Sequence, residues 1–359
     1  MKPELYFVFP GALSTLTGGY AYDRELIVVL EAAGIKVHPV ALSPRFPAPD
    51  QAALADAGAQ LAGIPDNALV LADGLAYGVM DAIAEAEHKR LNIIALCHHP
   101  LALESGLDAE AAARLFTSEK NALRLACAVV VTSQATAALL QSRFDIAADK
   151  ITVALPGTHK QVFAPCRGNP PRLLTVATLT RRKAHDVLIA ALARIHTLDW
   201  TARFVGGDHF DLVWASGLKE QCANLNLGER ICFAGSLDDL SAEYAAADMF
   251  VLPSRFEGYG MVFAEALAFG LPIVAAQAGA VPDVVPASAG VLVPPDDVDA
   301  LAAALQGILS RPAQFKALQQ GARTAAAGLP GWQDTGDKVI QLLQTVATNT
   351  QYKNHEAYP

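Results

Sequence analysis

The sequence lacks any uninterrupted apolar run of the ~20 residues that a membrane-spanning helix needs. Its start, MKPELYFVFPGAL, imitates an export signal only faintly, because Glu4 lies in the charged region and Pro10-Gly11 ends the apolar stretch. A first β-strand is the better interpretation of this segment. The basic residues of the segment 104–126 are too diluted by acidic ones for a membrane-binding face. We therefore expect a cytoplasmic protein with at most peripheral membrane association.

Cysteine is scarce, and no metal-ligand spacing is present. The five cysteines include no CxxC pair, which favours a reduced compartment over a disulfide framework. Cys97, His98 and His99 are adjacent, but neighbours in a strand point to opposite faces, and no further Cys or His follows at ligand spacing. We therefore expect no metal site.

Neither half of the chain is basic, and the dinucleotide fingerprint is missing. Residues 1–166 carry 12 basic and 17 acidic side chains and the remainder carries 15 and 19, which argues against nucleic acid as a partner. The spacing GxGxxG does not follow the first predicted strand, which argues against a nicotinamide enzyme.

The chain does contain a regular alternation of apolar strands and helical segments over 359 residues, 52% of them apolar. This pattern is typical of an α/β protein with more than one domain. We expect strands at 5–9, 36–42, 68–72, 92–97, 128–132, 151–155, 172–177, 202–205 and 231–233. Among the helices, we expect one from about residue 21 to 33, one over 79–89 and one over 104–126 with its start near Asp108. The polar, proline-punctuated run 156–171 indicates a linker. The predicted domains are 1–166 and 167–335, followed by a helix over 336–347 and a disordered tail over 348–359.

The stretch 250–275, FVLPSRFEGYGMVFAEALAFGLPIVA, is the most informative part of the sequence. It predicts a strand, a glycine loop, a helix and a second strand, the arrangement in which parallel sheets bind ligands at their strand ends. Glu257 and Glu265 frame the loop. An ionised carboxylate only accepts hydrogen bonds, so a diol such as a ribose or hexose edge is its natural partner. Gly258 and Gly260 allow close backbone approach, and the helix N-terminus favours an anion. A nucleotide sugar suits this layout.

The string PSRFEGYGMVFAEALAFGLPIVA resembles the E-x7-E signature of the retaining glycosyltransferases of family four, which have the GT-B fold. The resemblance covers nearly the whole chain, specifically in the second half and more loosely in the first. It implies two Rossmann-like α/β/α domains that face a deep interdomain cleft, with the last helix crossing back onto the first domain. The first domain would bind the acceptor and the second the nucleotide sugar.

The same resemblance implies roles for individual residues. Glu265 would bind the ribose of the donor, and Glu257 the transferred sugar. The other residues that would contact the donor's diphosphate and sugar in this loop are Gly258, Tyr259, Gly260 and Met261. Those that would contact the nucleotide are Gly235, Ser236, Leu237 and Val262.

A basic triplet, Arg181-Arg182-Lys183, precedes a predicted helix. It could hold an anion by side chains and backbone together, or it could be a solvated loop. The family carries G-R-L-x-x-R-K-G-x-D here, and its cations bind the donor diphosphate. Arg182 and Lys183 match this pattern, whereas Thr178 replaces the first Arg and Ala184 replaces the second Gly. Arg181 or Arg182 could supply the missing cation.

Two features of the first half are less specific. Gly18-Gly19 could admit a phosphate or form a simple turn, and the family has a glycine-rich loop here that faces the donor diphosphate. The family also often places a histidine near the transferred sugar at the end of strand 92–97. His98 is our candidate and His99 the alternative, against a plain capping role.

In the second half, the triplet 297–299 spells DxD, but its position before an Ala/Leu helix predicts an N-cap and first-turn acids.

Together these features predict metal-independent transfer of a hexose from a nucleotide-diphosphate sugar to a sugar, lipid-linked or small-molecule acceptor, with retention of configuration. A UDP-glucose-type donor and a role in polysaccharide, glycolipid or glycoconjugate biosynthesis are the first candidates. The predicted catalytic residues are Glu257, Lys183, Arg182 and His98. Two alternatives stay open: a nucleotide-sugar-binding protein that has lost transfer, and a GT-B phosphorylase or epimerase. No cofactor is expected, and no oligomeric state is indicated.

Overall fold

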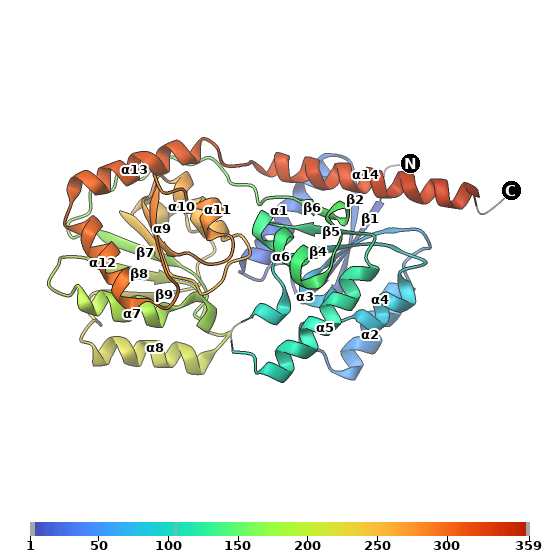
Figure 1. Ribbon diagram of the computed structural model, residues 1–359, viewed down its shortest axis with the longest axis horizontal. Helices are drawn as coiled ribbons and strands as arrows, with labels where there is room; N and C mark the ends of the chain where they lie inside the picture. Colours follow the sequence, from blue (N-terminus) through green and yellow to red (C-terminus); the bar gives the residue numbers. More distant parts are fainter. Residues whose placement is uncertain (1–3, 105, 357–359) are drawn as a thin grey trace. The chain divides into compact units, whose positions relative to one another are not determined.

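The structure, a computed structural model, describes residues 4–104 and 106–356 and divides into two units. The first unit is formed by Met1–Gly157 with Pro330–Pro359, and the second by Thr158–Leu329. Each unit contains one six-stranded parallel sheet with helices on both faces (Figure 1). The α/β class predicted from the alternation of strands and helices is therefore confirmed.

The sheet of the first unit has the strand order β2-β1-β3-β4-β5-β6. Its strands are β1 (Glu4–Pro10), β2 (Lys36–Leu42), β3 (Leu69–Asp73), β4 (Asn92–Cys97), β5 (Ala128–Val131) and β6 (Ile151–Val153). Its helices are α1 (Gly18–Ala32), α2 (Gln51–Ala62), α3 (Gly74–Tyr77), α4 (Asp81–Glu87), α5 (Ala109–Leu125), α6 (Gln134–Phe144) and α14 (Trp332–Glu356), with short 3₁₀ turns η1 (Leu101–Leu103) and η2 (Ala148–Lys150). The inner strands are unbroken apolar runs because helices cover both of their faces.

The sheet of the second unit has the order β12-β11-β10-β7-β8-β9. Its strands are β7 (Arg172–Val176), β8 (Thr201–Val205), β9 (Ile231–Gly235), β10 (Met249–Leu252), β11 (Ile273–Ala276) and β12 (Gly290–Val293). Its helices are α7 (His185–Arg194), α8 (Leu212–Asn224), α9 (Ser241–Ala245), α10 (Met261–Ala268), α11 (Val281–Val284), α12 (Val298–Leu309) and α13 (Pro312–Ala326), with the 3₁₀ turn η3 (Arg181–Lys183). The strand order reverses between β7 and β10, which is where open α/β sheets bind their ligands.

Local sequence signals set several boundaries as predicted. Strands β2 and β4 span the predicted residues, and Asp108 caps α5 by accepting a hydrogen bond from Ala111 N at 2.7 Å. The DxD triplet has the predicted capping role, because Asp297 accepts from Ala300 N at 2.8 Å and Asp299 pairs with Arg194. Side chains of this type satisfy helix N–H groups that have no partner within the helix.

Other boundaries differ from the prediction. Helix α1 begins at Gly18 instead of near residue 21, so the glycine pair lies in its first turn. The predicted helix 79–89 is shorter and spans Asp81–Glu87. Gly78 ends the preceding short helix α3, and a Cβ there would lie 2.8 Å from Leu101 and 3.0 Å from the carbonyl of Gly74.

The last helix is longer at both ends than the predicted range 336–347. Helix α14 begins at Trp332, and the predicted disordered tail is helical as far as Glu356; residues 357–359 lie outside the described part of the chain. The helix packs on the first unit through Val339, Leu343 and Val346, all of which are buried. Once such turns are docked, further residues extend the helix at little cost.

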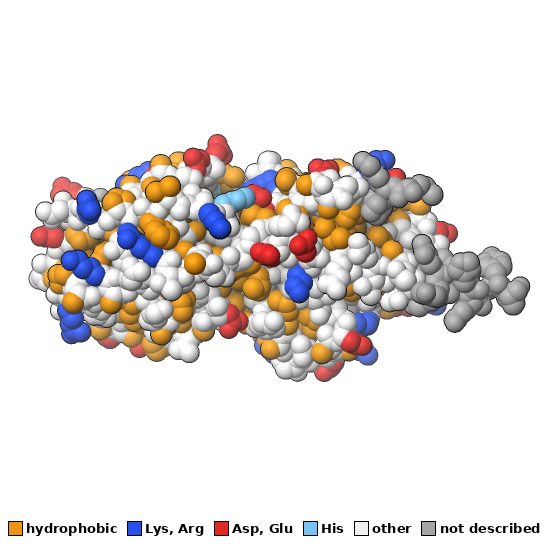
Figure 2. Space-filling view, turned by 90° about the horizontal axis from the view of Figure 1, so that it is seen from above, with side chains coloured by type: hydrophobic (Ala, Val, Ile, Leu, Met, Phe, Trp, Pro, Cys, Tyr) orange, Lys and Arg blue, Asp and Glu red, His pale blue; other side chains and the backbone are white. Residues whose placement is uncertain are grey.

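The described residues include no helix that is both long and apolar enough to cross a membrane. Figure 2 shows basic and acidic side chains interspersed over the face that it presents. This mixture fits the even, mildly acidic balance of both halves of the sequence.

Candidate functional site

The topology of the second unit brings together two loops that are far apart in the sequence. Strands β7 and β10 are neighbours and parallel, so the loops 177–184 and 253–260 leave the same edge of the sheet. The backbone of Arg255 donates to the carbonyl of Arg182 at 2.8 Å, and Arg182 Nη1 donates to the carbonyl of Phe256 at 3.1 Å. These bonds fix the basic triplet beside the glycine loop.

Glu257 is the buried centre of this arrangement, with 5% of its surface exposed. Its Oε1 accepts hydrogen bonds from Lys183 Nζ and Ser254 Oγ, both at 2.6 Å, and its Oε2 lies 3.5 Å from Arg182 Nη1. Burial by itself would raise the pKa of Glu257, but Lys183 and Arg182 outweigh it and hold that pKa below its usual value. The carboxylate is therefore ionised and clamped between two cations.

Two helices begin at this edge of the sheet without a side-chain cap. Helix α7 follows Ala184, which has the left-handed angles φ 53° and ψ 38°, and α10 follows Gly260, with φ 87°. A Cβ on Gly260 would lie 2.5 Å from Phe263, so this glycine is required for space as well as for its φ. Helix N–H groups that lack a side-chain partner can bind an anion.

Arg181 and Arg182 have different environments. Arg182 lies beside Glu257 with its side chain 16% exposed, whereas Arg181 is 49% exposed, stacks 4.5 Å above the Trp214 ring and lies 3.7 Å from Asp211. Thr178 is half-buried in the loop that joins β7 to the triplet. Of the two candidates for the missing cation, the structure brings Arg182 to Glu257.

Glu265 lies in the second turn of α10 and has a partner that the sequence did not indicate. Tyr244 Oη donates to Glu265 Oε2 at 2.7 Å and lies 3.4 Å from the carbonyl of Val262. The Tyr244 ring is buried and stacks on Phe269, with centroids 5.3 Å apart and planes at 13°. Burial raises the pKa of Glu265, and the bond from Tyr244 opposes this rise.

The other predicted donor contacts lie along the same edge of the second sheet. Those in or beside the glycine loop are Gly258, Tyr259, Gly260, Met261 and Val262. Gly235 ends the edge strand β9, two strands away from β7, and Ser236 and Leu237 follow it. Gly235 has φ 71°, the left-handed conformation that glycine adopts without strain.

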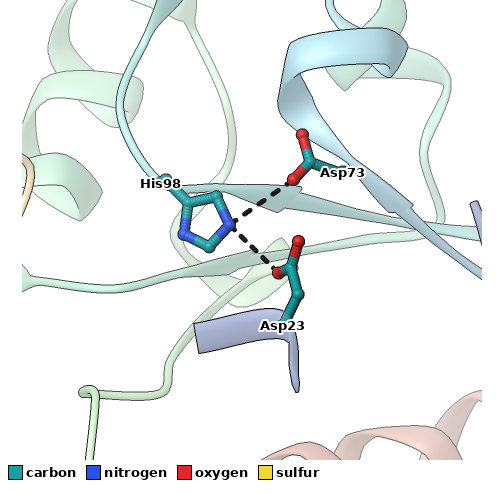
Figure 3. A group of neighbouring side chains, drawn as sticks. All are labelled: Asp23, Asp73 and His98. Atoms are coloured by element: carbon teal, nitrogen blue, oxygen red, sulfur yellow. Dashed lines mark hydrogen bonds and ion pairs between the residues drawn. The ribbon is translucent and has the colours of Figure 1, made fainter. Parts of the chain in front are cut away.

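In the first unit, His98 belongs to a cluster with two buried acids (Figure 3). His98 follows β4, Asp73 ends β3 and Asp23 lies in α1. His98 Nε2 is 3.2 Å from Asp23 Oδ1 and 3.6 Å from Asp73 Oδ2. The alternative, His99, instead lies 3.3 Å from Glu104.

Opposing electrostatic effects set the charges of this cluster. Burial and the neighbouring Asp73 raise the pKa of Asp23 to about 7. Burial would lower the pKa of His98, but bonds and charges from both acids raise it to about 10.

Of the two glycines in α1, one packs against this cluster. A Cβ added to Gly19 would lie 3.4 Å from His98 Cδ2, whereas the space around Gly18 is open. No metal-ligand spacing in the sequence indicates this cluster, although one nitrogen or oxygen atom of each of its three side chains lies within 4.8 Å of the other two. Its members are 25 and 75 residues apart, so no ligand spacing was visible.

Residues 170–311, which contain the loops around Glu257, match the family model described as glycosyl transferases of group 1. Residues 170–311, the greater part of the second unit, are thus similar to this family. The match runs from just before β7 to just after α12 and so lies within the second unit.

Curated proteins are similar to parts of the chain. One is a GDP-mannose-dependent alpha-(1-6)-phosphatidylinositol monomannoside mannosyltransferase from Mycolicibacterium smegmatis. The two sequences are 30% identical over an alignment that covers 49% of this chain and 48% of the relative's chain. Another is a lipopolysaccharide core biosynthesis mannosyltransferase from Rhizobium meliloti. It is 31% identical over an alignment that covers 58% of this chain and 66% of the relative's chain. The chain spans about half to two thirds of the length of the curated relatives it matches.

Solved structures match the fold over nearly the full chain. Sucrose-phosphate synthase from Thermosynechococcus elongatus has a TM-score of 0.82 at 24% identity and covers 97% of this chain and 100% of its own. Anabaena HepE, in complex with UDP and glucose, has a TM-score of 0.75 at 20% identity. The superposition covers 95% of this chain and 99% of the HepE chain. With its two parallel six-stranded sheets, the chain therefore has the predicted GT-B fold.

Proposed function

We propose that the protein transfers a hexose from a nucleotide-diphosphate sugar to an acceptor. The observation that carries this proposal is the ion-paired group of Glu257, Lys183 and Arg182 at the strand-order reversal of the second sheet. It combines cations for a phosphate with an ionised carboxylate for hydroxyl groups, within reach of two uncapped helix N-termini.

The leaving nucleoside diphosphate is the main charge that the site must stabilise. An ammonium donates up to three hydrogen bonds, so Lys183 would bind a phosphate oxygen of the donor beside Glu257. Arg182 adds a second fixed positive charge beside it. Donors that are already in place when charge develops on the leaving group lower the barrier without reorganisation.

The two carboxylates would divide the rest of the donor between them. Glu257, held ionised, would accept hydrogen bonds from hydroxyl groups of the transferred sugar. Glu265 would accept from the ribose, because one of its oxygens is fixed by Tyr244 while a carboxylate can accept several hydrogen bonds.

We further propose a front-face displacement with retention of configuration. The bond from the anomeric carbon to the diphosphate breaks, the acceptor oxygen bonds to that carbon on the same face, and a diphosphate oxygen takes the acceptor's proton. NMR of the product formed from a donor of known anomeric configuration tests this step. A product of inverted configuration would overturn it.

The resemblance favours UDP-glucose as the donor, whereas a similar protein named above is described as GDP-mannose-dependent. A thermal-shift screen of the purified protein with both donors and with free UDP and GDP separates these, because a ligand that binds only the folded state raises the melting temperature. Donors that bind are then assayed for turnover with sugar, lipid-linked and small-molecule acceptors. Binding without turnover would favour a nucleotide-sugar-binding protein, and phosphate-dependent cleavage or epimerised donor would favour the other alternative.

The proposed chemistry needs no metal ion, because Lys183, Arg182 and the helix N-termini supply the positive charge. Turnover should be unchanged in excess chelator. Loss of turnover that is restored by titrating manganese or magnesium would contradict this part of the proposal.

A further inference from the structure

The cluster in the first unit contains more negative charge than a histidine at a strand end requires. Asp23 and Asp73 are 0% and 1% exposed, and both lie against the Nε2 edge of the His98 ring (Figure 3). Asp23 Oδ2 is buried and has no hydrogen-bond partner within residues 4–104 and 106–356. Two carboxylates are costly to bury side by side unless a cation or a shared proton compensates them.

The ring of His98 is also held from its other sides. Tyr22 packs edge-on against it, with centroids 5.3 Å apart and planes at 81°, and Tyr22 is itself anchored by donating to the carbonyl of Ala154 at 3.1 Å. Gly19 brings the first turn of α1 against the ring. Figure 3 shows the second ring nitrogen, Nδ1, on the edge that faces away from both acids. These contacts fix the orientation of the His98 ring, so Nδ1 points away from both acids.

We propose that Asp23 and Asp73 are positioning residues that keep His98 protonated at Nε2 and aim its Nδ1–H at an oxygen atom of the bound substrate. His98 then acts as a fixed imidazolium donor at the carboxyl edge of the first sheet. A neutral histidine could present either a donor or an acceptor at Nδ1, whereas an imidazolium presents only a donor.

The surrounding groups support this charge state. Helix α1 contributes Tyr20 and Tyr22 as well as Asp23, and the adjoining strand end contributes Cys97. Burial raises the pKa of all three of these neutral groups, so they stay neutral. The two acids are thus the charges that face the ring, and they hold the pKa of His98 near 10.

The first test uses the full-length protein without substrate. The His98 imidazole is titrated by two-dimensional NMR in the wild type, Asp23→Asn, Asp73→Asn and the control Asp66→Asn, an exposed acid that pairs with Arg90. We expect the wild type and the control to stay protonated beyond pH 9, and each cluster variant to titrate at least one pH unit lower. A wild-type midpoint near the ordinary value of ~6.5 would overturn the proposal even if a variant fails to fold.

The second test rests on the proposed function, because it needs a donor that is turned over. The ratio of Asp73→Asn to wild-type turnover is measured from pH 6 to pH 9 and should fall at least tenfold as His98 loses its proton in the variant. A flat ratio would assign the two acids a merely structural role. If no donor is turned over, the proposed function fails while the NMR titration still decides the state of His98.

A third measurement examines the competing occupant of the cluster. Zinc or manganese is titrated into the wild-type protein while the His98 signals are observed. We expect no stoichiometric binding and no loss of the imidazole proton at neutral pH. Tight binding that displaces this proton would make the cluster a metal centre and overturn the proposal.

Discussion

In the second unit two cations lie against one carboxylate, whereas in the first unit two carboxylates lie against one edge of an imidazole. The excess charge is positive around Glu257 and negative or neutral around His98. On the proposed function, a diphosphate would bind at the edge of the second sheet and a hydroxyl-bearing group at the edge of the first. The same βα architecture thus supports two groups of charged residues of opposite character, one in each unit.

Two histidines, the buried His185 and the part-exposed His98, sharpen this contrast. Burial by itself lowers the pKa of both, yet His98 has a pKa of about 10 because of its two acids, and His185 has a pKa of about 3, with Lys183 adding to the effect of burial. Neighbouring charges, more than depth, decide which of the two is charged.

The largest effect is expected from removing the shared cation of the second unit. Lys183→Ala should lower turnover at saturating donor by roughly 100-fold or more, the scale seen when one preorganised stabilising group is lost. The control is Lys219→Ala, an exposed lysine of the same unit that pairs with Asp208 at 3.1 Å. Steady-state assays with the donor found in the screen provide the measurement. Near-normal turnover of Lys183→Ala would contradict our account of the site.

The two carboxylates of the second unit should separate binding from turnover. Glu265→Ala should weaken binding of free nucleoside diphosphate by about 1.5–3 kcal/mol, the worth of a hydrogen bond to a charged group. Glu257→Ala should leave this affinity unchanged or higher, because it removes a negative charge beside Lys183 and Arg182, and should instead lower turnover. Calorimetry and steady-state assays distinguish these outcomes. The opposite pattern would reverse the two assignments.

Tyr244→Phe should have a similar but smaller effect than Glu265→Ala. It keeps the stacked ring and deletes the hydroxyl that orients Glu265, so nucleoside diphosphate affinity should fall by about threefold to tenfold, or roughly 1 kcal/mol. The matched control is Tyr77→Phe, a buried tyrosine whose hydroxyl has no hydrogen-bond partner in the described structure. In a double-mutant cycle the loss should vanish when Glu265 is already alanine. An equal loss in both backgrounds would show that Tyr244 does not act through Glu265.

The fold could be predicted from local sequence signals, whereas contacts between residues far apart in the sequence could not. The capping role of Asp297 and the apolar strand β4 depend on neighbours a few residues away, so both were visible in the sequence. Ala184 stands where the family has a glycine. Its φ of 53° lies in the left-handed region, which glycine adopts most easily, and this explains the glycine of the family. Tyr244 and Asp23 were not singled out, because their partners lie 21 and 75 residues away and a single polar residue in a helix carries no local signal.

The smallest effect concerns His185, which is buried without a hydrogen-bond partner for either ring nitrogen in the described structure. Its pKa in the folded state, about 3, lies below the unfolded value of ~6.5, so the unfolded chain binds more protons between these values. Stability from this residue is therefore complete above pH 6.5 and is lost as the pH falls, by roughly 1 kcal/mol at pH 5.5. His185→Leu should remove this part of the pH dependence, and the exposed control His196→Gln should keep it. Hydrogen exchange of the amides of α7 and β8 at pH 7 and 5.5 measures the free energy of unfolding of the second unit separately from the first. An unchanged pH difference in His185→Leu would mean that His185 is not held neutral by its surroundings.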